Sequence, residues 1–192
     1  MTSAPAWQLL RLADAVPAPW RNGGGSTREL LAGPDAGNWR WRLSVAQVAQ
    51  AGPFSRYPGV QRWFAVLAGA GVRLRIDGEA HTLEAGSAPI CFDGAAAVDC
   101  ELVAGPTLDF NLMTRGGTAR MERVVERRSG TLRCGHLVAA YTHSRSARLL
   151  EVEGSTVLPP GTLAWRIVEA GASADSEVQL VAQDALWMEI AP

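Results

Sequence analysis

The chain has 192 residues, of which 47% are apolar, and its formal net charge at pH 7 is −1. This length fits one compact body or two small abutting lobes, and the apolar content is enough to build a hydrophobic core. The near-neutral charge argues against a general attraction to nucleic acid or to an anionic membrane. All 18 basic residues are arginines, which excludes Schiff-base chemistry by a lysine and a lysine-dependent phosphate loop.

Neither a secretory signal nor a membrane helix is expected. The N-terminus has no basic segment followed by an apolar stretch, and no run of 18 apolar residues occurs. These features predict a cytoplasmic protein. Three cysteines without CxxC spacing are expected to be free, buried thiols in a reducing compartment.

Period-two alternation predicts strands through the first part of the chain. The segments 39–45, 63–67, 72–76 and 107–115 have this pattern or a continuous apolar run, and 79–83 is expected as the return strand of a hairpin with 72–76. Asp77-Gly78 suits a two-residue hairpin turn between two of them. In the last segment Leu108, Phe110 and Leu112 share one face, so Asp109, Asn111, Met113 and Arg115 should share the other.

The second part of the chain is also predicted to be β. Met121 to Arg128 has enough charge for a short helix, but Val124-Val125 and its neighbours favour a strand. Short strands are then expected at 136–141, 149–152, 163–168, 178–181 and 186–190. Gly116-Gly117 is the best candidate boundary, which predicts domains of residues 1–117 and 118–192. Many short strands at close spacing indicate an all-β sandwich or barrel.

Three stretches together resemble the HutD/Ves family. They begin with Trp20 to Glu29, continue with Trp41 to Ala46 leading to Gly52-Pro53-Phe54-Ser55, and end with Asp109 to Arg115. The resemblance covers residues 15–117. It implies a bicupin, that is, two jelly-roll-like β-barrels of the RmlC-like cupin fold in one chain. It also implies a link to histidine utilisation, in which the family is thought to bind N-formylglutamate or a related intermediate and to moderate the pathway.

The metal-ligand pattern common in cupins does not match this sequence. When that pattern is aligned on Val66 to Gly69, Ser55 and Tyr57 fall where paired histidines should be, and Arg62 falls where the glutamate should be. A protonated guanidinium would repel a cation. His136 and His143, seven residues apart, are a weak signal for a metal on their own. We therefore expect no metal and no other cofactor.

A barrel with arginine in place of a carboxylate should favour an anion, because a guanidinium can hold a carboxylate with two parallel hydrogen bonds. Asn111 or Asn22 would suit a formamido group, and Trp20 could wall the pocket. Arg21, Arg28 and Glu29 could instead form ordinary surface ion pairs. The candidate ligand-binding residues are Trp20, Arg21, Asn22, Arg28, Glu29, Arg42, Ser44, Ser55, Arg62, Asp109, Asn111 and Arg115.

Three functions remain open from the sequence. The first is a non-catalytic binding protein for a small acidic metabolite that buffers or regulates histidine utilisation. The second is a metal-independent isomerase, epimerase or hydrolase that uses Glu29, Asp109 or Tyr57 as acid and base. The third is a structural bicupin that makes protein contacts through exposed tryptophans. The expected partner is the small metabolite, without nucleic acid or membrane, and the resemblance to cupins also allows a homodimer.

Overall fold

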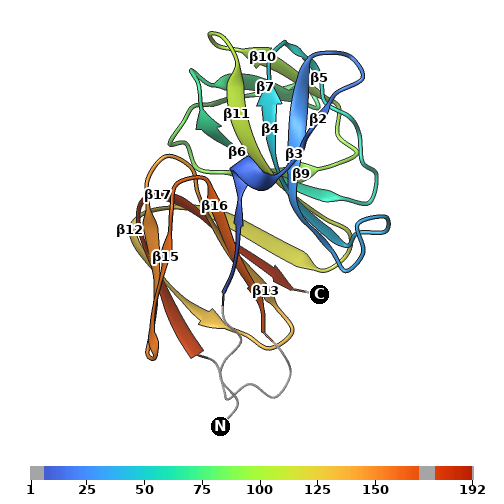
Figure 1. The fold of residues 1–192 in the computed structure, drawn as a ribbon. Helices are drawn as coiled ribbons and strands as arrows, with labels where there is room; N and C mark the ends of the chain where they lie inside the picture. Colours follow the sequence, from blue (N-terminus) through green and yellow to red (C-terminus); the bar gives the residue numbers. More distant parts are fainter. Residues whose placement is uncertain (1–6, 169–175, 192) are drawn as a thin grey trace. The chain divides into compact units, whose positions relative to one another are not determined.

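The computed structural model describes residues 7–168 and 176–191, and their regular structure is almost entirely β (Figure 1). These residues form strands β1 to β17 and one short 3-10 turn, η1 (Leu12–Asp14), with no α-helix among them. The all-β class predicted from the alternation is therefore confirmed. No helix in the described part of the chain is long and apolar enough to span a membrane.

The chain divides into two compact units, which we call the first unit (Ala15–Gly116) and the second unit (the described residues before Ala15 and after Gly116). The expected first domain of residues 1–117 needs a correction at its start. Strand β1 (Gln8–Arg11) pairs antiparallel with β16 (Thr162–Ile167), so it extends the sheet of the second unit. The alternation could not reveal this, because β1 pairs with a segment about 150 residues further along the chain.

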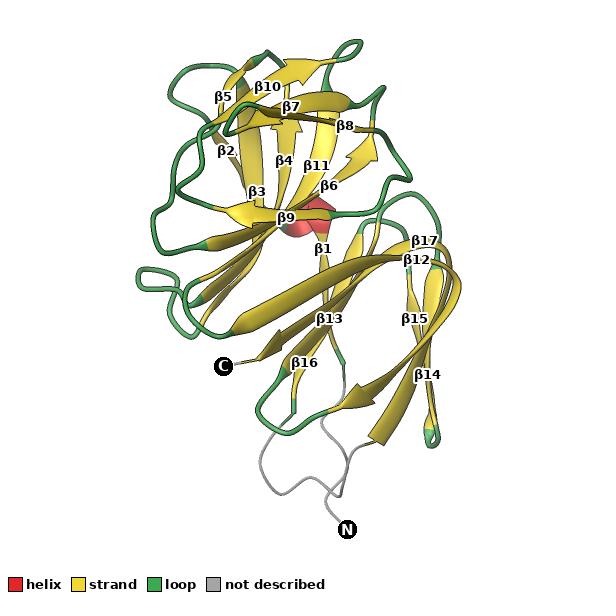
Figure 2. Ribbon diagram, turned by 180° about the vertical axis from the view of Figure 1, so that it is seen from behind, coloured by secondary structure: helices red, strands yellow, loops and turns green. Residues whose placement is uncertain are grey.

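The first unit consists of two antiparallel sheets (Figure 2). The six-stranded sheet has the order β2-β3-β4-β11-β6-β9, and the four-stranded sheet has the order β5-β10-β7-β8. The strands of the first sheet are β2 (Pro17–Pro19), β3 (Gly25–Gly33), β4 (Trp41–Val48), β6 (Gln61–Ala68), β9 (Ile90–Asp93) and β11 (Thr107–Thr114). Those of the second are β5 (Gly52–Pro53), β7 (Val72–Ile76), β8 (Glu79–Leu83) and β10 (Val98–Leu102).

The hydrophobic core of the first unit draws on both sheets. Phe64 and Val66 of β6 are fully buried and belong to one cluster with Val72 and Leu74 of β7 and Cys100 of β10. Side chains on the same face of the six-stranded sheet as Phe64 and Val66 therefore point between the two sheets. We call this the inner face. The hairpin between β7 and β8 turns at Asp77 and Gly78, whose φ angles are +46° and +93°, as predicted.

The first residue of β3, Gly25, allows two stretches of backbone to approach closely. A Cβ added to Gly25 would lie 2.2 Å from the carbonyl oxygen of Gln47 on β4 and 3.0 Å from the Trp20 ring. The first distance is far inside van der Waals contact, and a backbone atom cannot turn aside as a flexible side chain can. Glycine at position 25 therefore permits the close approach of β3 to β4.

Gly25→Ala is therefore expected to destabilise the protein by about 2 kcal/mol or more, because β3 would have to move away from β4. Gly52→Ala is the matched control, because a Cβ there would meet no heavy atom within 4 Å. Urea unfolding of both variants measures the difference. Equal stability of the two variants would show that β3 can shift at no cost.

The second unit is built on one seven-stranded antiparallel sheet, with the order β1-β16-β13-β17-β14-β15 and with β12 also paired to β17. Its remaining strands are β12 (Thr118–Leu132), β13 (Leu137–Thr142), β14 (Ala147–Glu151), β15 (Gly154–Leu158) and β17 (Ser176–Ala191). Side chains from β12 to β17 meet in a single core. The segments 178–181 and 186–190, expected as separate strands, are parts of the one long strand β17. Its pairing with β12 shifts register between Val124 and Glu126.

Candidate functional site

Polar side chains form a row across the inner face of the six-stranded sheet in the first unit. In register, Glu29 on β3 lies opposite Ser44 on β4, which lies opposite Asn111 on β11, which lies opposite Phe64 on β6. In the neighbouring row, Arg42, Met113 and Arg62 are opposite one another in the same way. Asp109 is on the same face of β11, since it is two residues from Asn111. Six of the twelve predicted residues, namely Glu29, Arg42, Ser44, Arg62, Asp109 and Asn111, thus share one face.

Arg62 is the most buried charged side chain in these two rows. Only 8% of the residue is exposed, and its Nε and Nη2 atoms both donate to the Asn111 Oδ1 atom, at 3.0 and 2.7 Å. The Nε/Nη2 edge of the guanidinium is therefore occupied by a neutral amide. Because a guanidinium has five N–H groups, three remain, and the edge formed by Nη1 and Nη2 is left for another acceptor. No carboxylate in the described residues forms an ion pair with Arg62.

Two phenyl rings hold the guanidinium of Arg62. Its Cζ atom lies 4.6 Å from the centroid of Phe54 and 5.5 Å from that of Phe92. Burial lowers the pKa of Arg62 to about 10, against the opposing effects of Tyr57 and Asp109, so the side chain stays protonated at neutral pH. The result is a buried positive charge with restricted motion, which is the arrangement that favours an anion.

Asp109 is fully buried beside this charge. Its Oδ2 atom accepts a hydrogen bond from the Thr107 hydroxyl at 2.8 Å, whereas its Oδ1 atom has no hydrogen-bond partner. Burial raises the pKa of Asp109 to about 7, although the Thr107 hydrogen bond and Arg62 both oppose that shift. The carboxyl is therefore about half protonated at neutral pH and does not fully neutralise Arg62 there.

Arg42 is less available than the sequence suggested. Its Nε atom donates to the Oε2 atom of Glu29 at 2.6 Å, with 22% of the arginine side chain and 41% of the glutamate side chain exposed. The pair lies on the inner face but in contact with solvent, so its net contribution to stability is small. Ser44, 4% exposed, lies between Glu29 and Asn111 in the register.

The other six predicted residues are not part of these two rows, although Trp20 packs on the core cluster that contains Phe64. Arg21 and Ser55 are exposed, and Asn22 accepts from the Gly24 amide at 3.0 Å. Trp20 donates to Thr27 Oγ1 at 2.8 Å. Arg28 lies in register with Val45, and its side chain donates to the carbonyl oxygen of Ala15. Arg115 follows β11, is exposed and stacks on Trp39 at 4.5 Å, so the predicted alternation does not extend to it.

Phe54, Phe92 and Thr107 were not predicted as site residues. Phe54 is part of the Gly52-Pro53-Phe54-Ser55 segment, but nothing in the sequence indicates that it contacts Arg62. The signal that could have found Phe92 is the strand 90–93, whose pairing with β6 places Phe92 opposite Arg62. Thr107 was on the predicted strand and on the same face as Asp109, so the i, i+2 spacing was the available clue.

In the second unit, the arginines that stack on tryptophans form ion pairs with glutamates. Arg166 is paired with Glu151 at 2.7 Å, and Arg128 is paired with Glu189 at 2.8 Å. Arg128 and Arg166 also stack on Trp187 and Trp7, respectively. This contrast singles out Arg62, whose hydrogen-bond partner is neutral.

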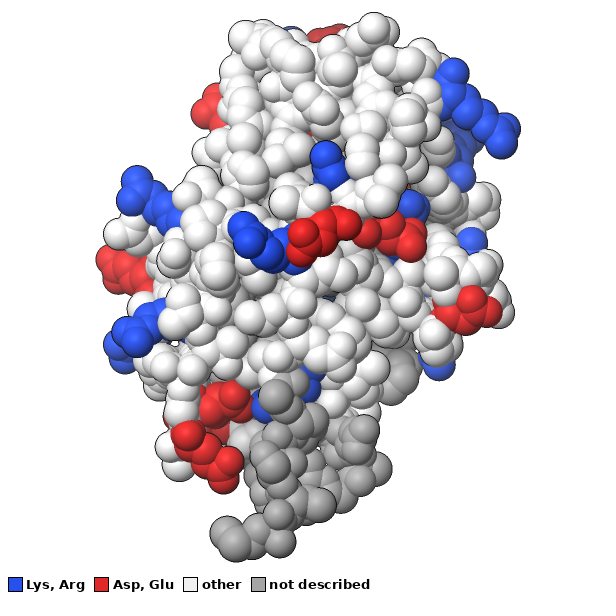
Figure 3. All heavy atoms as spheres, in the orientation of Figure 1, with Lys and Arg blue, Asp and Glu red and all other residues white. Residues whose placement is uncertain are grey.

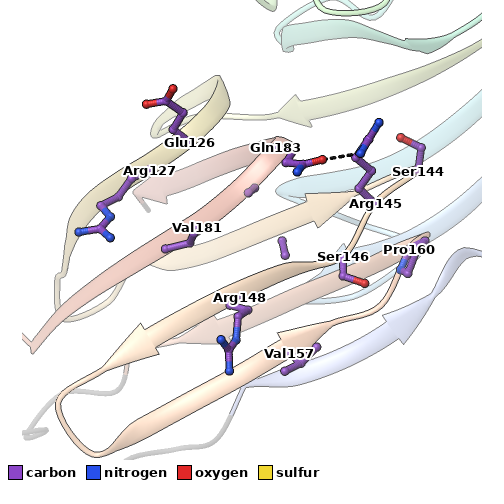
Figure 4. A pocket seen from close by; sticks show the side chains of 12 residues that line it. Glu126, Arg127, Ser144, Arg145, Ser146, Arg148, Val157, Pro160, Val181 and Gln183 are labelled. Atoms are coloured by element: carbon purple, nitrogen blue, oxygen red, sulfur yellow. Dashed lines mark hydrogen bonds between the residues drawn. The ribbon is translucent and has the colours of Figure 1, made fainter.

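The second unit also has an open depression of about 1150 Å³ between β12, β14 and β17 (Figure 4). It is lined by Arg127, Arg145 and Arg148 among others, and Arg145 donates to Gln183 at 2.5 Å. All three arginines are exposed. Because exposed guanidinium groups are well solvated, the depression is a weaker candidate for an anion site than the buried Arg62.

Two further expectations can be compared with the structure. Two of the seven tryptophans are buried and five are partly buried, so the exposed tryptophans expected for protein contacts are not present. Of the three cysteines, expected to be buried, only Cys100 is buried. Cys91 and Cys134 are exposed, because Cys91 lies on the outward side of its strand and Cys134 lies in a turn.

The face in Figure 3 carries scattered charges of both signs rather than one broad positive expanse. Among the described residues, no group of three or more His, Cys, Asp or Glu side chains is arranged to hold a metal ion.

Comparisons with known proteins show the family and the fold of this chain. A family model described as HutD matches residues 12–191, which extends through both units. A protein of the hutC 3' region of Pseudomonas putida is 40% identical over 108 residues, covering 55% of this chain and 57% of that protein. Protein Ves of Cronobacter sakazakii is 41% identical over 111 residues, covering 56% of this chain and 61% of that protein. The chain thus spans less than two thirds of the length of these curated relatives.

Solved structures match over nearly the whole chain. HutD from Pseudomonas fluorescens SBW25, in a formate condition, is 29% identical with a TM-score of 0.85, covering 97% of this chain and 98% of that chain. A conserved protein of unknown function from Pseudomonas aeruginosa PAO1 is 28% identical with a TM-score of 0.83 over the same shares. A cupin 2 conserved barrel domain protein from Leptotrichia buccalis, 7% identical with a TM-score of 0.59 over 96% of each chain, shows the fold alone. The predicted cupin fold is confirmed.

Proposed function

The chain belongs to the HutD family, and on that premise we propose that its first unit binds a small acidic metabolite, such as N-formylglutamate, without converting it. The observation that carries this proposal is the buried, protonated Arg62, whose hydrogen-bond partner is the neutral Asn111. A buried cation without a carboxylate partner is costly unless an anion completes the site. A carboxylate matches the free Nη1/Nη2 edge in shape and charge.

A dicarboxylate has a second carboxylate group that also needs a hydrogen-bond donor. Among the described residues, Arg42 is the other arginine that the strand register places on this face. Its partner Glu29 is partly exposed, and an exposed ion pair is worth about 1 kcal/mol or less. A ligand carboxylate can therefore replace Glu29 on Arg42 at low cost. Binding that removes the metabolite from solution would let the protein buffer or regulate histidine utilisation, and the hutC-region name of the Pseudomonas putida relative supports this context.

Calorimetric titration of the full chain with N-formyl-L-glutamate tests the proposal, followed by mass spectrometry of the recovered ligand. We expect saturable binding and an unchanged ligand mass. Acid–base catalysis is the second candidate, favoured by the pKa of Asp109 near 7, which suits a general acid or base at neutral pH. A changed ligand would favour that enzyme, and the absence of binding would refute the proposal.

Asn111→Asp tests whether the missing negative charge defines the site. The substitution places a carboxylate at the position of the Oδ1 atom that Arg62 already contacts, so Arg62 keeps its position but is neutralised. We expect affinity for N-formyl-L-glutamate to fall by about 100-fold or more, because the ligand would have to displace a buried ion pair. Undiminished affinity in a folded Asn111→Asp protein, measured by the same titration, would show that Arg62 is not the anion site.

A further inference from the structure

The proposed anion site contains a second buried group whose role is not explained by the pairing of Arg62 with Asn111. Asp109 has an exposure of 0% and lies on the inner face of β11, two residues from Asn111. One carboxyl oxygen, Oδ2, accepts from Thr107 at 2.8 Å, and the other, Oδ1, has no hydrogen-bond partner. A buried carboxylate oxygen without a donor is unfavourable, whereas a carboxylic acid can carry its proton on that oxygen and point it at an acceptor.

We propose that Asp109 is protonated in the ligand-bound protein and donates a hydrogen bond from Oδ1 to the bound anion, so that binding is linked to proton uptake. This inference rests on the proposed function and adds a reason why the site would prefer one class of anion. The site would then present a guanidinium and a neutral acid together, which suits a small carboxylate. The Thr107 hydroxyl donates to Oδ2, and this contact orients the carboxyl so that Oδ1 is the atom left for the ligand.

The groups that face Asp109 allow this linkage to be measured. Arg62 on β6 and Cys100 on β10 interact with it electrostatically, and Tyr57 and Arg42 act on Arg62. Burial lowers the pKa of Arg62 only to about 10 and raises the pKa of Cys100 to about 12. Both of those pKa values lie well above the range from pH 6 to pH 8.5, whereas the pKa of Asp109 is about 7.

Calorimetric titration with N-formyl-L-glutamate between pH 6 and pH 8.5 tests the proposal. If only the protonated form of Asp109 binds, affinity should fall about tenfold for each pH unit above 7, or roughly 30-fold from pH 6 to pH 8.5. Asp109→Asn cannot change its protonation and should give a flat profile. Asp99→Asn, an exposed position on β10, is the control and should keep the wild-type slope. A wild-type profile without a slope, or a slope that persists in Asp109→Asn, would overturn the proposal.

A second measurement does not depend on any Asp109 variant. NMR titration of the Asp109 Cγ resonance should give a pKa that rises when N-formyl-L-glutamate is bound, and Thr107→Val should raise it further because a donor to the charged form is lost. A bound-state pKa below that of the free protein would contradict the proposal. If no binding occurs at pH 6, the proposed function fails. If binding occurs without the linkage, only the role assigned to Asp109 fails.

Discussion

Arg62→Ala is expected to weaken binding of N-formyl-L-glutamate by about 100-fold, which corresponds to about 2 to 3 kcal/mol. The variant loses the charged donor edge that would hold a ligand carboxylate, and it leaves the Asn111 Oδ1 atom without the two donors it has in the wild-type protein. Isothermal titration calorimetry at pH 6 measures the change in affinity.

Arg62→Lys distinguishes the effect of the guanidinium shape from that of the positive charge, and Arg73→Ala serves as a control. Arg62→Lys keeps a cation but loses the planar fork, so its affinity should lie between those of the wild-type protein and Arg62→Ala. Arg73→Ala removes an arginine of the same unit that is 57% exposed and 3.5 Å from Glu101, and it should bind like the wild type. Equal affinity of Arg62→Ala and Arg73→Ala, with both folded by thermal melting, would place the ligand away from Arg62.

Asp109→Asn is expected to gain stability relative to the wild type as the pH rises. The pKa of Asp109 is raised by burial from 3.8 to about 7, so the native state binds the proton more tightly than the unfolded state. Its favourable contribution is complete below about pH 4 and is lost as the pH rises to about 7, with a total of about 4 kcal/mol as an upper limit. Asparagine resembles the protonated acid in shape and does not ionise, so the variant does not lose this stabilisation as the pH rises.

The measurable result is the difference in unfolding free energy between Asp109→Asn and the wild type at two pH values. That difference should grow by about 2 to 3 kcal/mol between pH 5 and pH 8, even if the substitution has a constant cost of its own. The exposed variant Asp99→Asn should show no such growth. If the difference instead shifted in favour of the wild type between pH 5 and pH 8, Asp109 would be an ionised partner of Arg62 and the site would be neutral.

Alternation along single strands identified much of the candidate site. It placed Asp109 and Asn111 on one face of β11 and placed Arg42 and Ser44 together on β4, because the period of two is a local property of the backbone. It could not give the pairing of Arg62 with Asn111, which lie 49 residues apart. Such contacts depend on strand order and register, which no local pattern specifies.

The two-unit organisation shows the same limit. The Gly116-Gly117 boundary was visible as a local break in the pattern, but the place of β1 in the sheet of the second unit was not. Arg115 was assigned to the site by extending the alternation past the end of β11, where the chain turns and the side chain stacks on Trp39. The protonation of Asp109 depends on burial by the surrounding strands, which is a property of the folded unit.

The most direct test of the anion site is a crystal structure of the full chain grown with N-formyl-L-glutamate at pH 6. We expect one ligand carboxylate within about 3 Å of the Nη1 and Nη2 atoms of Arg62, the usual length of a charge-assisted hydrogen bond, with the Asn111 contact retained. A metal ion on the inner face of the first unit, or the ligand bound elsewhere with Arg62 unchanged, would contradict the account.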